Sequence, residues 1–269
     1  MLSFKQEFQL KNFKFNYRPV KDFVTSPWFP TPVLIIYRCV FAIYSTTWIT
    51  YRLFAHDRFR KVVTMFYMTN WSYFTLINYF SISAGITIIH YIKKRQGKEH
   101  VIVDDVEKGQ PRDDETRWYH KMQWFFYSVA STQAIGVTLF FWLFDYDGMG
   151  ITLSDVNVHV LNSVFMLIDH SLSSMPVRVL HVVYPMAFIL LYMIATVLYW
   201  ALISKEYIYK KMDYSTNPGL AVGLLLAAMF IIAPVVHSFY YATYRLRAYL
   251  AAKLTKDDSE ELGEEMQGK

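Results

Sequence analysis

The sequence predicts an all-α membrane protein, a polytopic bundle of about six transmembrane helices with both termini in the cytosol. Three observations carry this prediction. Of the 269 residues, 54% are apolar and 18% are charged, whereas soluble domains contain roughly 25% charged residues. The apolar residues gather into nearly charge-free stretches of about 20 residues, the length that a helix needs to cross the hydrocarbon core. Lys and Arg are also distributed unevenly among the intervening loops.

The composition excludes several other classes of protein. The apolar content is too high for a disordered chain. The single cysteine, Cys39, excludes a disulfide scaffold and a cysteine zinc site. The histidines show no ligand-like spacing, and no phosphate loop or dinucleotide fingerprint occurs, so we expect no metal and no cofactor. The net charge of +5 requires no nucleic acid, because anionic lipid at the cytosolic face accounts for it.

The chain divides into three parts. Residues 1–32 mix cations with aromatic residues, lack the apolar region of a signal peptide and end in three prolines, so we expect a cytosolic, interfacial segment. Residues 33–250 form the bundle, and residues 251–269 form an acidic cytosolic tail. The expected spans are 33–53, 65–92, 122–144, 156–172, 179–203 and 219–244, of which the fourth is the shortest and most polar. Residues 93–121 form a polar cytosolic loop.

The loops orient the bundle. With six spans, both termini lie on one side of the membrane. That side carries 19 Lys and Arg residues, against seven on the other side, and Arg38 lies inside the first span. Because cytosolic loops carry an excess of Lys and Arg, the termini are expected in the cytosol. The host membrane is expected to be the plasma membrane or the endoplasmic reticulum.

Two of the spans carry polar stripes, which must face other helices or a cavity because polar groups are costly in lipid. In the second span, Trp71, Thr75 and Asn78 fall within about 60° of one another on a helical projection. In the fourth span, five residues occupy an arc of about 80°: His159, Asn162, Met166, Asp169 and Ser173.

Thr75 and His159 lie at similar expected depths in the outer half of the bundle. Their offset is roughly 7 Å at 1.5 Å per residue, which helix tilt can absorb. A hydroxyl beside an imidazole is the pairing of covalent catalysis, in which the imidazole accepts the hydroxyl proton as the oxygen attacks an ester. Structural roles are the alternative, since a membrane threonine usually bonds a backbone carbonyl and a histidine can simply join helices.

Asp169 cannot complete a catalytic triad, because it lies about 15 Å from His159 along the same helix. Its expected depth matches that of Arg38. We therefore expect a buried Arg38–Asp169 ion pair that joins the first and fourth helices, with Arg178 as the rival partner.

At these two helices the chain resembles the rolling stone proteins, multi-pass membrane proteins linked to myoblast fusion. More distantly it resembles the androgen-induced and androgen-dependent TFPI-regulating proteins, intramembrane threonine hydrolases that cleave fatty acid esters of hydroxy fatty acids. The matching stretches are Trp71-Ser-Tyr-Phe-Thr75-Leu-Ile-Asn78, His159-Val-Leu-Asn-Ser-Val-Phe-Met-Leu-Ile-Asp169 and Met175-Pro-Val-Arg178. The hydrolases have an acid at the position of Asn78 and a second histidine before the position of His159.

The resemblance implies that Thr75 is a nucleophile and His159 the catalytic histidine of a lipid acyl-ester hydrolase. Asn78 or Asn162 would stabilise the oxyanion, and the expected partners are membrane lipids, including a fatty acyl ester as substrate. The alternative is a non-enzymatic protein that acts in cell–cell fusion or membrane organisation. A small channel or transporter is a third reading, which rests on the polar stripes alone. The sequence indicates no particular protein partner.

Overall fold

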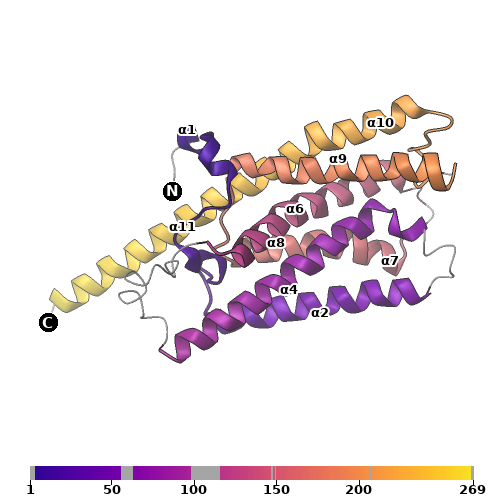
Figure 1. The fold of residues 1–269 in the computed structure, drawn as a ribbon. Coiled ribbons are helices and arrows are strands. Elements are labelled where there is room, and N and C mark those ends of the chain that lie inside the picture. Colours follow the sequence, from indigo (N-terminus) through magenta and orange to yellow (C-terminus); the bar gives the residue numbers. More distant parts are fainter. Residues whose placement is uncertain are drawn as a thin grey trace, which may run out of the picture.

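The computed structural model describes residues 4–55, 63–97, 116–146, 148, 150–205 and 207–267, and every regular element within these ranges is helical (Figure 1). The bundle consists of long helices and one broken helix. Their bounds are α2 Thr31–Ala55, α4 Met68–Arg95, α6 Trp118–Phe140, α7 Leu153–Val156, α8 Asn162–Leu172, α9 Val183–Leu198, α10 Pro218–Ala227 and α11 Ala233–Gln267. A 3-10 turn, Val179–Val182, leads into α9.

The helices lie side by side along one common direction (Figure 1). α2, α6 and α9 run one way, and α4, α7–α8 and α10–α11 run back. α2 and α4 form one side of the bundle, α9 and α10 form the other, and α6 and α8 lie between them. The N-terminal segment and the end of α11 lie toward the same end of the bundle (Figure 1). The side of the membrane on which the termini lie stays a prediction.

Within the described part of the chain, four π-helical turns interrupt or extend these helices. They cover Phe141–Asp145 after α6, Asn157–Leu161 between α7 and α8, Tyr199–Ile203 after α9, and Ala228–Ile232 between α10 and α11. A π turn contains more residues than an α-helical turn, so it changes which side chains share a face. The turn at 157–161 therefore alters the stripe that the sequence predicts for His159 and Asn162.

Helix starts follow capping chemistry. At α7, Thr152 and Asp155 form a reciprocal capping box: the Asp155 amide donates to Thr152 Oγ1 at 3.2 Å, and the Thr152 amide donates to Asp155 Oδ2 at 2.9 Å. At α10, Asn217 accepts a hydrogen bond from the Leu220 amide at 3.2 Å, and Pro218 occupies the first helical position.

The N-terminal segment packs against the end of the bundle. It contains α1, Phe4–Glu7, and two 3-10 turns, Leu10–Phe13 and Val20–Phe23. Phe23 is fully buried, and the Ser174 amide donates to the Thr25 carbonyl at 2.9 Å. Pro27 and Pro30 precede α2, whereas Pro32 is the second residue of that helix, where the first turn tolerates a proline. Apolar side chains thus dock this part of the chain onto the helices.

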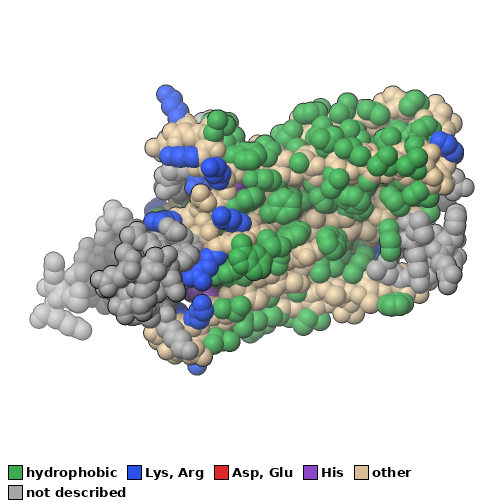
Figure 2. Space-filling view, viewed as in Figure 1, with side chains coloured by type: hydrophobic (Ala, Val, Ile, Leu, Met, Phe, Trp, Pro, Cys, Tyr) green, Lys and Arg blue, Asp and Glu red, His purple; other side chains and the backbone are tan. Residues whose placement is uncertain are grey.

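Among the described residues, five helices are long and apolar enough to cross a membrane: Thr31–Arg52, Met68–Arg95, Trp118–Asp145, Val179–Ile203 and Pro218–Leu254. Apolar side chains cover the middle of the face shown in Figure 2, whereas Lys and Arg gather toward the end that carries the termini. The expected fourth span, 156–172, is helical but does not reach this apolarity. Its residues Met166 and Asp169 are fully buried within the bundle. That this segment crosses the membrane stays a prediction.

The expected C-terminal tail is helical along most of its length. The chain continues as helix α11 to Gln267, well past the expected end of the last span at residue 244 and through most of the 251–269 tail. Ala, Leu, Lys and Glu dominate that stretch, and these are strong helix formers. α4 ends at Arg95 and α6 begins at Trp118, which agrees with a connection in this region. Residues 98–115 of the expected loop 93–121 lie outside the described residues.

Candidate functional site

His159 lies in the π turn before α8 and faces the end of α6. Its ring stacks in parallel on Phe141, with centroids 3.8 Å apart and planes 3° apart. The backbone carbonyl of His159 accepts a hydrogen bond from Thr138. The ring Nδ1 is buried and has no hydrogen-bond partner within the described residues. The stacked ring is therefore held in place, while its Nδ1 makes none of the hydrogen bonds that stabilise the described structure.

A cavity of about 70 Å³ adjoins this imidazole. Its walls are mainly apolar and aromatic, and they come from α4, α6, α9, α10–α11 and residues 209–212. Thr69, Thr132, Gln133 and Asp145 supply polar groups. The Thr132 hydroxyl is buried and has no partner in the described ranges, whereas Gln133 donates to the Pro185 carbonyl at 3.3 Å. This volume is far below the roughly 300–1,000 Å³ of ordinary ligand pockets, so the cavity has room for only a short segment of an apolar chain.

Thr75 does not reach the imidazole in this structure. Its hydroxyl is buried and donates to the Ser72 carbonyl of the same helix at 2.7 Å. Thr75 does not line the His159 cavity, and no hydrogen bond joins the two side chains in the part of the chain described here. Thr75 therefore has the backbone-bonded arrangement that is usual for a membrane threonine.

The relative register of α4 and α8 accounts for this separation. The Asn162 amide lies 3.5 Å from Ser72 Oγ, so these two residues share a level. His159 lies three residues before Asn162, and Thr69 lies three residues before Ser72; both line the cavity. Thr75 is six residues beyond Thr69, about 9 Å deeper at the rise of an α-helix. The depth offset between Thr75 and His159 predicted from the sequence was roughly 7 Å. Helix tilt does not remove the observed offset, and the two side chains stay apart.

The two candidate oxyanion donors lie in different surroundings. Asn78 is half-buried and donates to the Phe74 carbonyl of its own helix at 2.8 Å. Asn162 is fully buried, and its amide donates to the Val158 carbonyl at 3.3 Å. The Asn162 side-chain oxygen has no partner within the described residues. Of the two, Asn162 lies nearer to His159.

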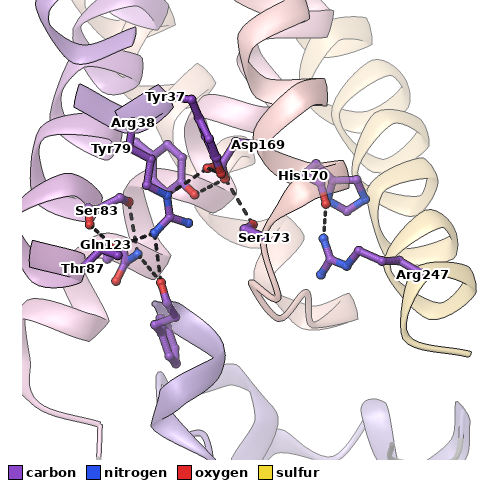
Figure 3. A network of polar contacts seen from close by, with 11 residues as sticks. Tyr37, Arg38, Tyr79, Ser83, Thr87, Gln123, Asp169, His170, Ser173 and Arg247 are labelled. Carbon is purple, nitrogen blue, oxygen red and sulfur yellow. Dashed lines mark hydrogen bonds and ion pairs between the residues drawn. The ribbon is translucent and has the colours of Figure 1, made fainter. Parts of the chain in front are cut away.

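Arg38 and Asp169 meet in the centre of the bundle, as expected from the sequence (Figure 3). Arg38 Nε donates to Asp169 Oδ1 at 3.1 Å, and neither side chain is exposed. The rival, Arg178, instead pairs with Glu7 at 3.2 Å. The Arg38 guanidinium also donates to the Phe23 carbonyl at 3.2 Å and to Thr87 Oγ1 at 2.8 Å. The pair thus connects α2, α4, α8 and the N-terminal segment.

Two tyrosines complete this network, and the sequence analysis did not identify them. Tyr37 donates to Asp169 Oδ1 at 2.7 Å, and Tyr79 donates to Oδ2. On α4, the buried polar stripe runs through Ser72, Thr75, Tyr79, Ser83 and Thr87. The spacing of three or four residues is visible in the sequence, but tyrosine is common both at membrane interfaces and in cores, so the spacing alone did not single out Tyr79. A second network was also missed: His170 contacts Tyr127 OH at 2.6 Å and Thr243 Oγ1 at 2.8 Å.

Nothing in the described part of the chain gathers three potential metal ligands among His, Cys, Asp and Glu. The candidate site thus offers an imidazole, hydroxyls, an amide and an apolar cavity. These groups suit proton transfer and the binding of an acyl chain.

Long apolar helices with a buried ionic network define a multi-pass helical membrane protein. Comparison with known proteins narrows this class, because residues 1–256 match the family model described as Protein rolling stone. The chain therefore belongs to the rolling stone family, as the sequence motifs indicated. It is 24% identical to Protein rolling stone of Drosophila melanogaster over 91% of this chain and 90% of that protein. No solved structure matches the chain.

Proposed function

We propose that this rolling stone family member is an intramembrane hydrolase of lipid acyl esters, located in the plasma membrane or the endoplasmic reticulum. One observation supports the proposal most directly: His159 Nδ1 is buried beside an apolar cavity and has no hydrogen-bond partner among the residues that the structure describes. An imidazole with a free nitrogen accepts a proton, and apolar walls accommodate an acyl chain.

In the proposed reaction, Thr75 Oγ1 attacks the ester carbonyl and His159 accepts the hydroxyl proton. That proton passes to the departing alcohol as the ester C–O bond breaks. Water then attacks the acyl-threonine, which releases the fatty acid and restores the hydroxyl. Asn162 is the better placed of the two oxyanion donors. The assignment of Thr75 rests on the resemblance to the threonine hydrolases.

The separation between Thr75 and His159 sets a requirement on this mechanism. Thr75 must exchange its bond to the Ser72 carbonyl for one to the imidazole. Because Tyr79 on α4 donates to Asp169 on α8 and holds these helices in register, closing the gap of about 9 Å requires a local bend or unwinding of α4. Catalytic hydrogen bonds are often formed only with substrate bound. Thr69 and Thr132 are the competing hydroxyls, because both line the His159 cavity without any such movement.

The test is labelling by a fluorophosphonate probe in membranes from cells that express the full chain. Labelling is expected for the wild type and is expected to vanish in Thr75→Ala and His159→Ala at equal protein levels. Thr196→Ala is the matched control, since Thr196 is also buried and donates to the carbonyl three residues before it, that of Met193. Loss in Thr69→Ala or Thr132→Ala, with Thr75→Ala still labelled, would reassign the nucleophile. No labelling of the wild type would contradict the enzyme.

A second candidate function is non-enzymatic action in cell–cell fusion or membrane organisation. The observation that favours it is the hydrogen bond of Thr75 within its own helix, which gives this residue a structural role without His159. This reading predicts that Thr75→Ala retains full activity in a cell-fusion assay, whereas changes in the outer loops abolish it. Loss of fusion in Thr75→Ala with normal expression would count against it.

A further inference from the structure

A second cavity, larger and more polar, lies at the other end of the bundle from His159. Its volume is about 610 Å³, within the range of small-molecule sites. The N-terminal segment, residues 174–178 and α11 form its walls. It lies at the end where Lys and Arg gather in Figure 2. The cavity therefore occupies the end that we expect at the cytosolic membrane surface.

The charged side chains that line this cavity are mostly arginines. Four arginines face two carboxylates there, a formal excess of two positive charges: Arg18, Arg178, Arg245 and Arg247 against Glu7 and Asp22. Each carboxylate has one partner, while Glu7 Oε2 is buried without one among the described residues. Glu7 pairs with Arg178 at 3.2 Å, and Asp22 accepts a hydrogen bond from Tyr17 OH at 2.7 Å. The cavity is therefore suited to an anion.

Arg247 is the most buried of the four arginines, with 7% of its surface exposed. It donates to two backbone carbonyls, those of His170 and Met175, the latter at 2.7 Å. These partners are neutral, so within the described residues no carboxylate forms an ion pair with its guanidinium. Because guanidinium groups bind phosphate through several hydrogen bonds, such a charge favours a phosphate ligand.

Helix α11 divides its side chains between the cavity and the apolar outer surface. Ala248, Ala251 and Ala252 line the cavity with small side chains that leave room for a ligand. Leu246, Leu250 and Leu254 alternate with them and are 56%, 43% and 52% exposed. A charged cavity next to apolar, outward-facing leucines matches a molecule with an anionic headgroup and acyl tails.

We propose that this cavity binds the phosphate headgroup of an anionic membrane lipid, with the lipid tails lying along the exposed leucines of α11. Basic pockets among transmembrane helices on the cytosolic side bind lipid headgroups in this way. The proposal does not depend on hydrolysis at His159, because none of the cavity residues takes part in that site.

The test uses the purified full chain in neutral detergent, titrated with dioctanoyl phosphatidic acid, dioctanoyl phosphatidylcholine or glycerol 3-phosphate, with binding followed by thermophoresis. Phosphatidic acid is expected to bind at least about tenfold more tightly than the other two ligands. Equal binding of both lipids would overturn the proposal. Equal binding of glycerol 3-phosphate would overturn the lipid assignment and identify a site for soluble phosphate.

Variants locate the site. The double variant Arg18→Gln/Arg245→Gln is expected to bind phosphatidic acid about tenfold more weakly, whereas Arg95→Gln at the end of α4 should bind like the wild type. Ala248→Phe tests the cavity without changing charge and should block binding; Ala242→Phe, on the exposed side of α11, is its control. Unchanged binding in both the arginine double variant and Ala248→Phe would overturn the proposal.

Discussion

Arg38 Nε donates to Asp169 Oδ1 at 3.1 Å, and both side chains are completely shielded from solvent. Tyr37 and Tyr79 donate to the same carboxylate. The carboxylate therefore accepts hydrogen bonds from α2 and α4 while it belongs to α8. Since charge is costly in the bundle interior, the pair fixes the position of the short polar helix among its apolar neighbours.

Loss of one partner of this pair should be strongly destabilising. Arg38→Met or Asp169→Leu leaves an uncompensated buried charge, which costs about 3–5 kcal/mol. The double variant Arg38→Met/Asp169→Leu should be more stable than either single variant, because no lone charge remains. Thermal unfolding of the purified chain in detergent measures this cycle, with Arg95→Gln as the control. Single variants that are as stable as the wild type would show that the pair does not hold the helices together.

Arg247 should stabilise the end of α8. Its guanidinium donates to the His170 and Met175 carbonyls, near the point where α8 ends at Leu172. A cation there satisfies terminal carbonyls and interacts favourably with the negative end of the helix dipole. Arg247→Ala should lower stability by about 1–3 kcal/mol, and Arg247→Lys should restore only part of the loss. Thermal unfolding measures both, and full rescue by lysine would contradict the role of the two separate hydrogen bonds.

Asp22 should make stability depend on pH. Burial raises the pKa of its carboxyl above the ordinary value, although the Tyr17 hydroxyl acts in the opposite direction. The folded chain therefore holds this proton more tightly than the unfolded chain, and the stabilisation present below the ordinary pKa is lost as pH rises through the raised pKa. Asp22→Asn removes that loss. The melting temperature of Asp22→Asn minus that of the wild type should therefore increase as pH rises from about 4 to about 7.

Asp213 provides the control of opposite sign. The Thr216 hydroxyl and neighbouring amides lower the pKa of this exposed carboxyl. Its stabilisation is present above the ordinary pKa and is lost as pH falls through the lowered value. The melting temperature of Asp213→Asn minus that of the wild type should therefore decrease as pH rises. The same direction of change in both variants would contradict the assignment of Asp22.

Labelling of introduced cysteines tests the orientation of the bundle in the membrane. The excess of Lys and Arg predicts that the N-terminal segment is cytosolic and that the turn before α10 is on the other side. In a Cys39→Ala background, a membrane-impermeant maleimide should label Thr216→Cys from the non-cytosolic side of sealed membranes. Lys5→Cys should be labelled from that side only after permeabilisation. The reverse pattern would show the opposite topology.

The helical bundle and its central ion pair were predictable from the sequence because their signals are strong and local. About 20 apolar residues identify a span, and a lone arginine in one span requires a partner at the same depth in another. Arg38 and Asp169 satisfied both conditions. The hydrogen bonds from Tyr37 and Tyr79 were not predicted, since tyrosine is common both at membrane interfaces and in cores.

The register of Thr75 and His159 was not predictable in the same way. The depth estimate assumed continuous α-helices, but His159 lies in a π turn that changes the facing of the residues around it. Side-chain packing between α4 and α8 then set Asn162 level with Ser72. An offset of a few residues between two helices depends on such contacts, and neither helix encodes it alone.

Hydrolysis itself is the most direct measurement of the proposed function. The purified wild-type chain, reconstituted in lipid, should release free fatty acid from a fatty acid ester of a hydroxy fatty acid. His159→Ala and Thr75→Ala should each lower that rate by at least about 10²-fold, whereas Thr196→Ala should retain it. Absence of release by the wild type, or equal release by His159→Ala, would contradict an intramembrane hydrolase.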